Sequence, residues 1–408
     1  MTSSTPPPPQ GAQAANPAPI AIVGGGFGGL YTALALAEQR QHPPILLIEP
    51  REHFLFLPLL YELLSDELRR WEIAPRYDAL LAGRGIAWLK DSVVRIDSTS
   101  KTLQTATGRE LAYSQLVVAT GARLHSFGIP GVLDHALGFR TLADVERLQQ
   151  LVERLRQQRH PLQRLAIVGA GPSGVELACK LADVLAGAAV VELIEQGPTP
   201  LAQARAFNRE QALLALQRRD VRLRCQCRVL EVGSDQISLQ SASGTERLTV
   251  QGVVWTAGLD FVAPAIEPPP ERDGRGRLAV DSHLRLVGHD DLYALGDIAA
   301  LPSGEDPENS PGSQASPAPP ATAQVAFQQA TCLAANLMQA RRDGALQAFA
   351  FQDLGEMLSL GRGEASLVAG GITLAGAPAF QLRRLAYLTR LPGRSHQLRV
   401  AAGWLADW

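Results

Sequence analysis

The stretch Ile20–Gly29, with the sequence IAIVGGGFGG, decides the fold of this 408-residue chain. Four apolar residues predict a buried strand, and the glycines after them allow a tight turn into a helix predicted from Tyr31. Ile45–Ile48 predicts a second buried strand, which is followed directly by Glu49. A strand, a helix and a strand within about 30 residues form the unit that binds a dinucleotide.

The glycines of this turn stand at the spacing G-x-G-x-x-G, filled by Gly24, Gly26 and Gly29. They permit the turn, let backbone N–H groups approach a pyrophosphate, and let the helix pack closely on the strand. The carboxylate of Glu49 would accept hydrogen bonds from a ribose hydroxyl. The predicted cofactor-binding residues of this unit are Gly24, Gly26, Phe27, Gly28, Gly29 and Glu49.

The same pattern recurs further along the chain, so the sequence predicts two dinucleotide sites. Leu165–Val168 leads into the turn GAGPSG at 169–174, a helix extends to about Leu185, and Val190–Ile194 predicts the next strand. Glu195 would repel the extra phosphate of NADPH and therefore favours NADH, although a neutralised or reoriented carboxylate would allow NADPH. The predicted residues of this second site are Gly169, Gly171, Pro172, Ser173, Gly174 and Glu195.

The bulk composition excludes several other classes of protein. The net charge of −2 gives no general attraction to nucleic acid, so none is expected as a partner. The four cysteines have neither the spacing of a zinc site nor that of a disulfide framework, so no metal site and a reducing compartment are expected. Cys225 and Cys227 are predicted to be ordinary buried thiols, with a redox pair as the alternative.

Three further segments, at 117–121, 255–258 and 293–297, follow in the order typical of two-dinucleotide flavoproteins. With the two glycine turns, they resemble the pyridine nucleotide-disulfide oxidoreductase superfamily. The resemblance implies FAD in the first site and NADH or NADPH as the substrate of the second. It adds to the cofactor-binding residues Ala119, Thr120, Gly121, Ala257, Gly258 and Asp297.

Within that superfamily, His53–Tyr61 and Ala323–Gln329 resemble type II NAD(P)H:quinone oxidoreductases. Gln324 and Gln328 are four residues apart and share one helical face, where their amides could bind a quinone carbonyl. The alternative is a helix with two solvent-facing glutamines. The cysteine pair that disulfide reductases of this fold need is missing, and the cysteines do not match sulfide:quinone reductases convincingly. The chain length and C-terminal tail are similar to the cyanobacterial and plastid branch, which includes demethylphylloquinone reductases.

The resemblance implies that hydride passes from NAD(P)H to the flavin and that two electrons then reach a quinone, without proton pumping. The quinone would be a naphthoquinone such as demethylphylloquinone, or plastoquinone. Glu176 would orient the nicotinamide or relay a proton; the alternative is a glutamate stabilised at a helix N-terminus. Competing functions are the reduction of a small redox protein and redox sensing through bound FAD and NAD(H).

The predicted fold class is α/β, with two Rossmann-like dinucleotide-binding domains and a small C-terminal region. The NAD(P)H domain is inserted into the FAD domain. The predicted divisions are a disordered leader at 1–18, the first part of the FAD domain at 19–130, the NAD(P)H domain at 131–277, the second part of the FAD domain at 278–345 with a flexible insertion at 302–320, and the C-terminal region at 346–408.

The C-terminal tail predicts contact with a membrane. Residues 369–408 contain five arginines and one aspartate, a net charge of +4. Ala379–Leu391 and His396–Trp408 are predicted as short helices with leucine and aromatic residues on one side and arginine on the other, which favours anionic lipid. The alternative is a tail packed on its own protein or on a partner in a homodimer. The expected location is peripheral, on the cytoplasmic side of a thylakoid or plasma membrane.

Overall fold

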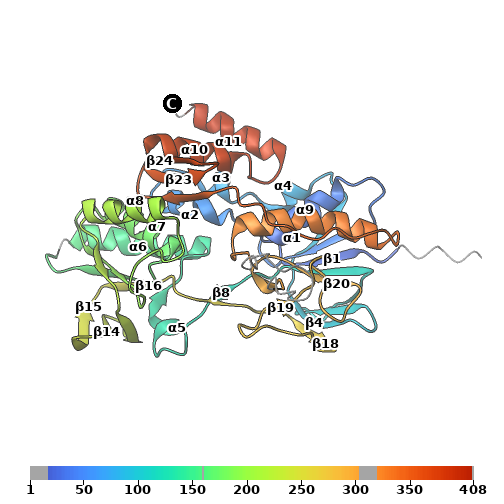
Figure 1. The fold of residues 1–408 in the computed structure, drawn as a ribbon, viewed down its shortest axis with the longest axis horizontal. Coiled ribbons are helices and arrows are strands. Elements are labelled where there is room, and N and C mark those ends of the chain that lie inside the picture. The colour runs from blue at the N-terminus through green and yellow to red at the C-terminus, as the bar shows by residue number, and fades with distance from the viewer. Residues whose placement is uncertain (1–16, 159, 303–318, 407–408) are drawn as a thin grey trace, which may run out of the picture.

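The computed structural model describes residues 17–158, 160–302 and 319–406 (Figure 1). Nearly all of the predicted leader and of the predicted insertion at 302–320 lies outside these residues. Two five-stranded sheets, both entirely parallel, form the frame of the molecule and confirm the predicted α/β class. Each sheet contains one of the two predicted strand–helix–strand units.

The first sheet has the strand order β20-β7-β1-β2-β3. Its central strand β1 (Ile20–Val23) pairs in parallel with β2 (Ile45–Ile48) and β7 (Gln115–Val118), and all four residues of β1 are buried. Helix α1 (Phe27–Ala37) begins directly after the glycine turn, earlier than predicted, because Gly26 is already its N-cap residue. The outer strands are β3 (Ile86–Leu89) and β20 (Leu292–Ala294).

The second sheet has the order β12-β11-β10-β16-β9. Its members are β9 (Ala136–Leu137), β10 (Arg164–Val168), β11 (Val190–Ile194), β12 (Arg222–Arg224) and β16 (Gly252–Trp255). The helices of this domain are α5 (Val132–His135), α6 (Leu142–Gln158), α7 (Pro172–Leu185) and α8 (Ala206–Arg218). An antiparallel sheet beside them contains β13 (Arg228–Val232), β14 (Gln236–Ser241) and β15 (Gly244–Thr249).

Two chain crossings join these domains. β8 (Arg123–Leu124) leaves the first domain and pairs antiparallel with the returning β17 (Leu259–Asp260). Next in the chain, β18 (Ala265–Glu267) pairs with β4 (Val93–Asp97) of the first domain, although the predicted boundary at 277 assigned this strand to the second. The smaller elements of the first domain are α2 (Leu60–Leu64), α3 (Arg70–Ile73), α4 (Tyr77–Leu81), β5 (Thr102–Thr105), β6 (Glu110–Ala112), β19 (Leu278–Ala279), β21 (Ala299–Ala300) and α9 (Ala323–Ala340).

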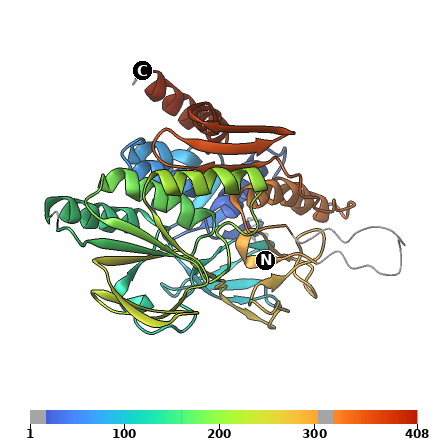
Figure 2. The ribbon, with the colours of Figure 1, turned by 60° about the vertical axis from the view of Figure 1, so that its left-hand side comes forward.

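The C-terminal region lies over both domains (Figures 1 and 2). It comprises a three-stranded antiparallel sheet and two helices, with bounds β22 (Glu356–Ser359), β23 (Ala365–Ala369), β24 (Ile372–Gly376), α10 (Ala377–Leu388) and α11 (Arg394–Ala406). Strand β22 contacts α7 of the second domain. On the first domain, Trp404 donates its indole N–H to Glu72 Oε1 at 2.8 Å.

The two tail helices are present, but the predicted division of their faces is wrong in part. Arg383 is only 1% exposed, and the aromatic rings of Phe380 and Trp404 are buried on the protein itself. Arg383 is buried because it pairs with Glu62, which lies 321 residues earlier in the chain. Leucines, rather than aromatic residues, form the exposed apolar surface of these helices. Of the helices in the described ranges, none has the length and apolar character to cross a bilayer.

Candidate active site

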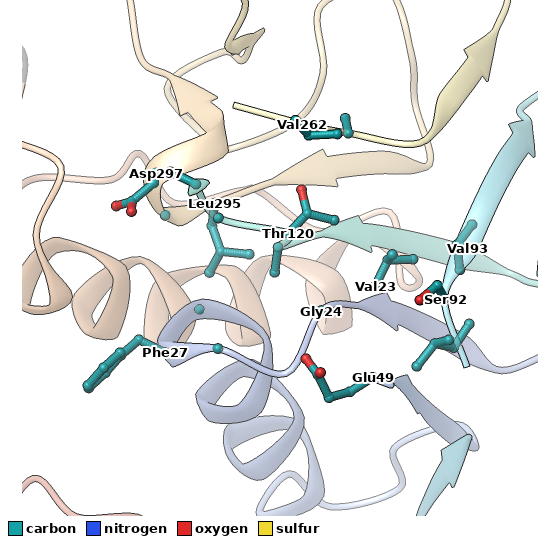
Figure 3. Close-up of a pocket in the computed structure, with 18 of the residues that line it drawn as sticks. Val23, Gly24, Phe27, Glu49, Ser92, Val93, Thr120, Val262, Leu295 and Asp297 are labelled. Carbon is teal, nitrogen blue, oxygen red and sulfur yellow. The ribbon is translucent and has the colours of Figure 1, made fainter. Parts of the chain in front are cut away.

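A cavity of about 570 Å³ lies where β1, β2, β7 and β20 end (Figure 3). The glycine turn forms its floor, and Thr120 and Asp297 lie on the opposite side. The open C-terminal edge of a parallel sheet is where α/β proteins bind ligands. The predicted residues that line the cavity are Gly24, Gly26, Phe27, Gly28, Glu49, Ala119, Thr120, Gly121 and Asp297.

The glycines of the turn divide into two kinds, according to what a side chain would meet. A Cβ atom on Gly29 would stand 1.8 Å from the carbonyl oxygen of Gly24, so this glycine allows the helix to pack against the turn. A Cβ atom on Gly26 would meet no protein atom within 4 Å. Gly26 therefore leaves open space at the start of α1, and the exposed N–H groups of a helix N-terminus fit the pyrophosphate of FAD there.

Glu49 is buried and held from two sides. The N–H of Gly25 donates to Oε2 at 2.7 Å, and the N–H of Arg51 donates to Oε1 at 2.9 Å. The guanidinium of Arg51 also donates to both oxygens, at 2.7 and 2.9 Å. Burial alone would raise the pKa of Glu49, but the hydrogen bonds and charge of Arg51 outweigh it, so the pKa is lowered. The carboxylate is therefore ionised and held in place at the wall of the cavity, and its contact with a ribose stays a prediction.

Asp297 lies at the opposite end of the cavity, in the turn after β20. Burial raises its pKa, while the positive charge of Arg140 opposes that shift across 3.8 Å. The backbone of the turn is fixed because Gly296 N–H donates to Gln329 Oε1 of α9 at 2.7 Å. Sequence analysis missed both Arg51 and Arg140. Arg51 had a local signal two residues after Glu49, whereas Arg140 had none.

The second dinucleotide turn repeats this geometry. A Cβ atom on Gly174 would stand 1.8 Å from the carbonyl oxygen of Gly169, and one on Gly171 would meet nothing within 4 Å. Glu195 accepts the N–H of Ala170 at 2.8 Å and the N–H of Gly197 at 2.7 Å. The open start of α7, at Pro172, Ser173 and Gly174, thus fits a second pyrophosphate.

The return crossing lies against this second turn. A Cβ atom on Gly169 would come within 3.0 Å of Ala257 N, and the hydroxyl of Thr256 donates to the carbonyl oxygen of Val168 at 2.8 Å. Gly258 has a φ of +72° and packs against the ring of Phe127. Ala257 and Gly258 therefore border the second site, and their contact with a dinucleotide stays a prediction.

Glu176 is buried at the junction of all three parts of the chain. Its Oε1 accepts the N–H of Ser359 from β22 at 2.7 Å, and Arg383 of α10 lies 3.8 Å away. Burial raises its pKa to about 7, with Arg383 and the Ser359 hydrogen bond opposing the shift. Glu176 thus titrates near neutrality, as proton-transferring groups in enzymes commonly do.

A buried charge network surrounds this glutamate. Glu62 of α2 pairs with Arg383, and Lys180 of α7 lies 3.8 Å from Glu62 and pairs with Glu67. Arg383 also donates to the carbonyl oxygen of Pro58 at 2.6 Å. These pairs link α2, α7 and α10, so the C-terminal region belongs structurally to the site. The network was not predicted from the sequence, because its members lie far apart along the chain and only the fold brings them together.

A second cavity, of about 190 Å³, lies beside the first, and we call it the aromatic cavity because four aromatic residues line it: Phe27, Phe56, Phe327 and Tyr387. Gln324 and Gln328 of α9 line it, as predicted. The amide of Gln328 donates to the carbonyl oxygen of Gln352 at 2.8 Å and accepts its N–H at 2.9 Å, whereas among the described residues the Gln324 side chain makes one hydrogen bond, of 3.4 Å. Gln324 is therefore the freer amide, and the role of both toward a quinone stays a prediction.

Phe27 and Ala323 line both cavities. The ring of Phe27 packs edge-on against Phe54 and Phe56, at centroid distances of 5.3 and 5.2 Å. Phe54, Phe56, Leu59 and Tyr61 are all buried, and Phe56 also lines the smaller cavity. Two dinucleotide sites with an apolar cavity next to the first define the class of a flavin-dependent nicotinamide oxidoreductase.

Comparison with known proteins agrees with this class. The model of the pyridine nucleotide-disulphide oxidoreductase family matches residues 18–330. The chain is 38% identical to demethylphylloquinone reductase NdbB of Synechocystis, over 95% of this chain and 97% of the relative. It is 34% identical to the chloroplastic/mitochondrial alternative NAD(P)H-ubiquinone oxidoreductase C1 of Arabidopsis thaliana, over 95% and 80% of the two chains.

Comparison with solved structures finds the same fold. The structure of NDH2 from Plasmodium falciparum in complex with NADH superposes with a TM-score of 0.82 at 18% identity, covering 96% of this chain and 98% of that one. The chain belongs to the pyridine nucleotide-disulphide oxidoreductase family, and its dinucleotides are FAD and NAD(P)H. Among that family, its relatives include type II NAD(P)H:quinone oxidoreductases, as the resemblance predicted.

Proposed function

We propose that this chain oxidises NAD(P)H and reduces a quinone, with FAD as the group between them. The observation that carries the proposal is that Phe27 and Ala323 border both the dinucleotide cavity and the aromatic cavity. A flat quinone ring in the smaller cavity would lie next to a flavin in the larger one. FAD, when bound, supplies the two-electron chemistry, and the protein supplies position and electrostatics.

The nicotinamide substrate binds at the second turn, and NADH is the proposed preference. Glu195 is held by two backbone N–H groups, so its carboxylate faces the position of the adenine ribose. A ribose with free hydroxyls can donate to this carboxylate, whereas a 2′-phosphate would meet a like charge. The similarity to NdbB suggests a naphthoquinone as the acceptor, with plastoquinone as the second candidate.

Glu176 is the proposed proton-handling residue of the site. Its carboxyl is buried beside Arg383 and has a pKa of about 7, so it can hold or release a proton at neutral pH. Tyr61 lies close to it, and burial together with the charge of Glu176 raises the pKa of that phenol. The tyrosine therefore stays protonated and can donate a hydrogen bond.

The C-terminal region is proposed to bind the surface of a membrane from its cytoplasmic side, where a lipid-soluble quinone would be reached. Its exposed large apolar side chains lie on β24, α10 and α11: Ile372, Leu382, Leu385, Leu398 and Leu405. These side chains gain free energy by leaving water for the lipid interface. Pairing through this region into a homodimer is the alternative, and a molar mass of two chains without lipid would favour it.

Anaerobic stopped-flow on the purified holoprotein tests the proposed function. Mixing with NADH or NADPH should bleach the flavin absorbance, and a naphthoquinone or benzoquinone added next should restore it rapidly. Bleaching that no quinone reverses would instead indicate a small redox protein as the acceptor or a sensing role. Absence of bleaching by either nucleotide would contradict the proposal at its first step.

A further inference from the structure

Arg390 lies in the loop between α10 and α11 and forms part of the wall of the aromatic cavity. The loop is braced from two directions. The hydroxyl of Tyr31, on α1, donates to the carbonyl oxygen of Arg390. Gln397 of α11 donates its amide to the carbonyl oxygens of Thr389 and Leu391, at 3.0 and 2.7 Å. The backbone of the loop at Arg390 is therefore held in place by the fold.

The charge of Arg390 has no acidic partner in the described part of the chain. Its charged neighbour Arg383 on α10 pairs with Glu62 and lies near Glu176, whereas Arg390 forms no ion pair there. Its positive charge instead acts on two phenols of the cavity region. Burial raises the pKa of both Tyr31 and Tyr387; Arg390 partly offsets the rise at Tyr31, and at Tyr387 Arg383 offsets it more than Arg390 does. A guanidinium beside an apolar cavity, without a carboxylate, is a preformed place for an anion.

We propose that Arg390 lets the acceptor site also take quinones that carry a negatively charged substituent on the ring, in addition to the neutral quinones of the proposed function. This inference rests on the proposed function, because it assigns the aromatic cavity to the acceptor. The aromatic walls would hold the ring, and the guanidinium would pair with a carboxylate or sulfonate at its edge. A charge-assisted hydrogen bond away from bulk water is favourable enough to change acceptor selectivity about tenfold.

Two acceptors of the same ring size separate charge from shape: neutral 2-methyl-1,4-naphthoquinone and anionic 1,4-naphthoquinone-2-sulfonate. The measured quantity is kcat/KM for each with the holoenzyme in lipid-free buffer, and the ratio of the two is compared among variants. Arg390→Gln should lower the anionic-to-neutral ratio about tenfold, and Arg390→Lys should restore most of it. Arg394→Gln, an exposed arginine at the start of α11, is the matched control and should keep the wild-type ratio.

Flavin bleaching by NADH should be the same in all four proteins, because Arg390 does not line the dinucleotide cavity. An unchanged ratio in Arg390→Gln, or an equal loss for both acceptors, would overturn the inference. Weaker binding of Arg390→Gln to anionic vesicles with an unchanged ratio would mean that the anion is a lipid phosphate, and would also overturn it. If the wild-type holoenzyme bleaches but reduces neither quinone, the proposed function itself fails.

Discussion

The two dinucleotide turns have the same backbone arrangement but differ in the groups that bind their acidic side chain. In each turn, two backbone N–H groups donate to the carboxylate at 2.7–2.9 Å. The first belongs to the glycine turn, and the second belongs to the residue two positions after the glutamate. In the first turn the residue two positions beyond the glutamate is Arg51, whose guanidinium also binds Glu49. In the second turn that position is Gly197, which has no side chain.

This difference predicts that the two sites bind their dinucleotides with different affinity. The guanidinium of Arg51 fixes the carboxylate of Glu49 and balances its negative charge, which suits a cofactor that stays bound through many turnovers. Glu195 keeps its outer side open, so a ribose can arrive and leave without displacing an ion pair. We therefore expect the first site to bind its dinucleotide more tightly than the second.

The largest effect is expected from a methyl group on the packing glycine of either turn. Gly29→Ala or Gly174→Ala forces a Cβ atom to within 1.8 Å of a backbone carbonyl oxygen, and backbone cannot rotate away as a side chain can. Each change should lower the free energy of unfolding by about 3 kcal/mol or more, measured by urea denaturation. Nearly equal decreases in the free energy of unfolding would confirm that the two glycine turns pack against their helices in the same way. A decrease of less than about 1 kcal/mol in either variant would contradict this.

A smaller effect is expected at the acid of the second turn. Glu195→Gln removes the charge that repels a 2′-phosphate, so the ratio of kcat/KM for NADH over NADPH should fall about tenfold. The exposed Glu210 on α8 offers a control, because Glu210→Gln removes the same charge far from the turn. An unchanged ratio in Glu195→Gln would remove the charge argument for NADH.

A further prediction concerns how the free energy of unfolding depends on pH through the group at the junction of the domains. The pKa of Glu176 rises from 4.5 to about 7 on folding, so the folded protein binds more protons than the unfolded chain between these values. The unfolding free energy of the wild type should therefore fall as pH rises through that window and level off above it. Glu176→Gln should lack this fall, and parallel pH curves for the two proteins would rule out the raised pKa.

The sequence predicted the parts of this molecule that depend on local pattern. The strands Ile20–Val23, Ile45–Ile48 and Val190–Ile194 have the predicted bounds, because a short, largely apolar run that ends at a glycine or a glutamate leaves little choice. Most first-site residues predicted from the glycine turn border one cavity, and the four that the family resemblance added, Ala119, Thr120, Gly121 and Asp297, border it too. The roles of Glu176, Gln324 and Gln328 stay predictions, although the structure places each of them in a cavity wall or at the domain junction.

What the sequence could not predict depends on contacts between distant segments. Arg383 reads as a surface arginine of an amphipathic helix, yet it pairs with Glu62 in the interior. No periodicity within α10 reveals that partner, because it lies on an element of the first domain. The pairing of β18 with β4 could not be predicted for a similar reason, since the two strands lie about 170 residues apart in the chain.

Spectral titration of two glycine variants directly tests the assignment of FAD to the first turn and NAD(P)H to the second. Neither new methyl group would meet a protein atom within 4 Å, so the fold should be kept. The variants are Gly26→Ala at the first turn and Gly171→Ala at the second. Gly26→Ala should fold but be purified without flavin absorbance. Gly171→Ala should keep its flavin and need at least tenfold more NADH for half-maximal bleaching. Normal flavin content in the first variant, or flavin loss in the second, would contradict the assignment of FAD and NAD(P)H to the two turns.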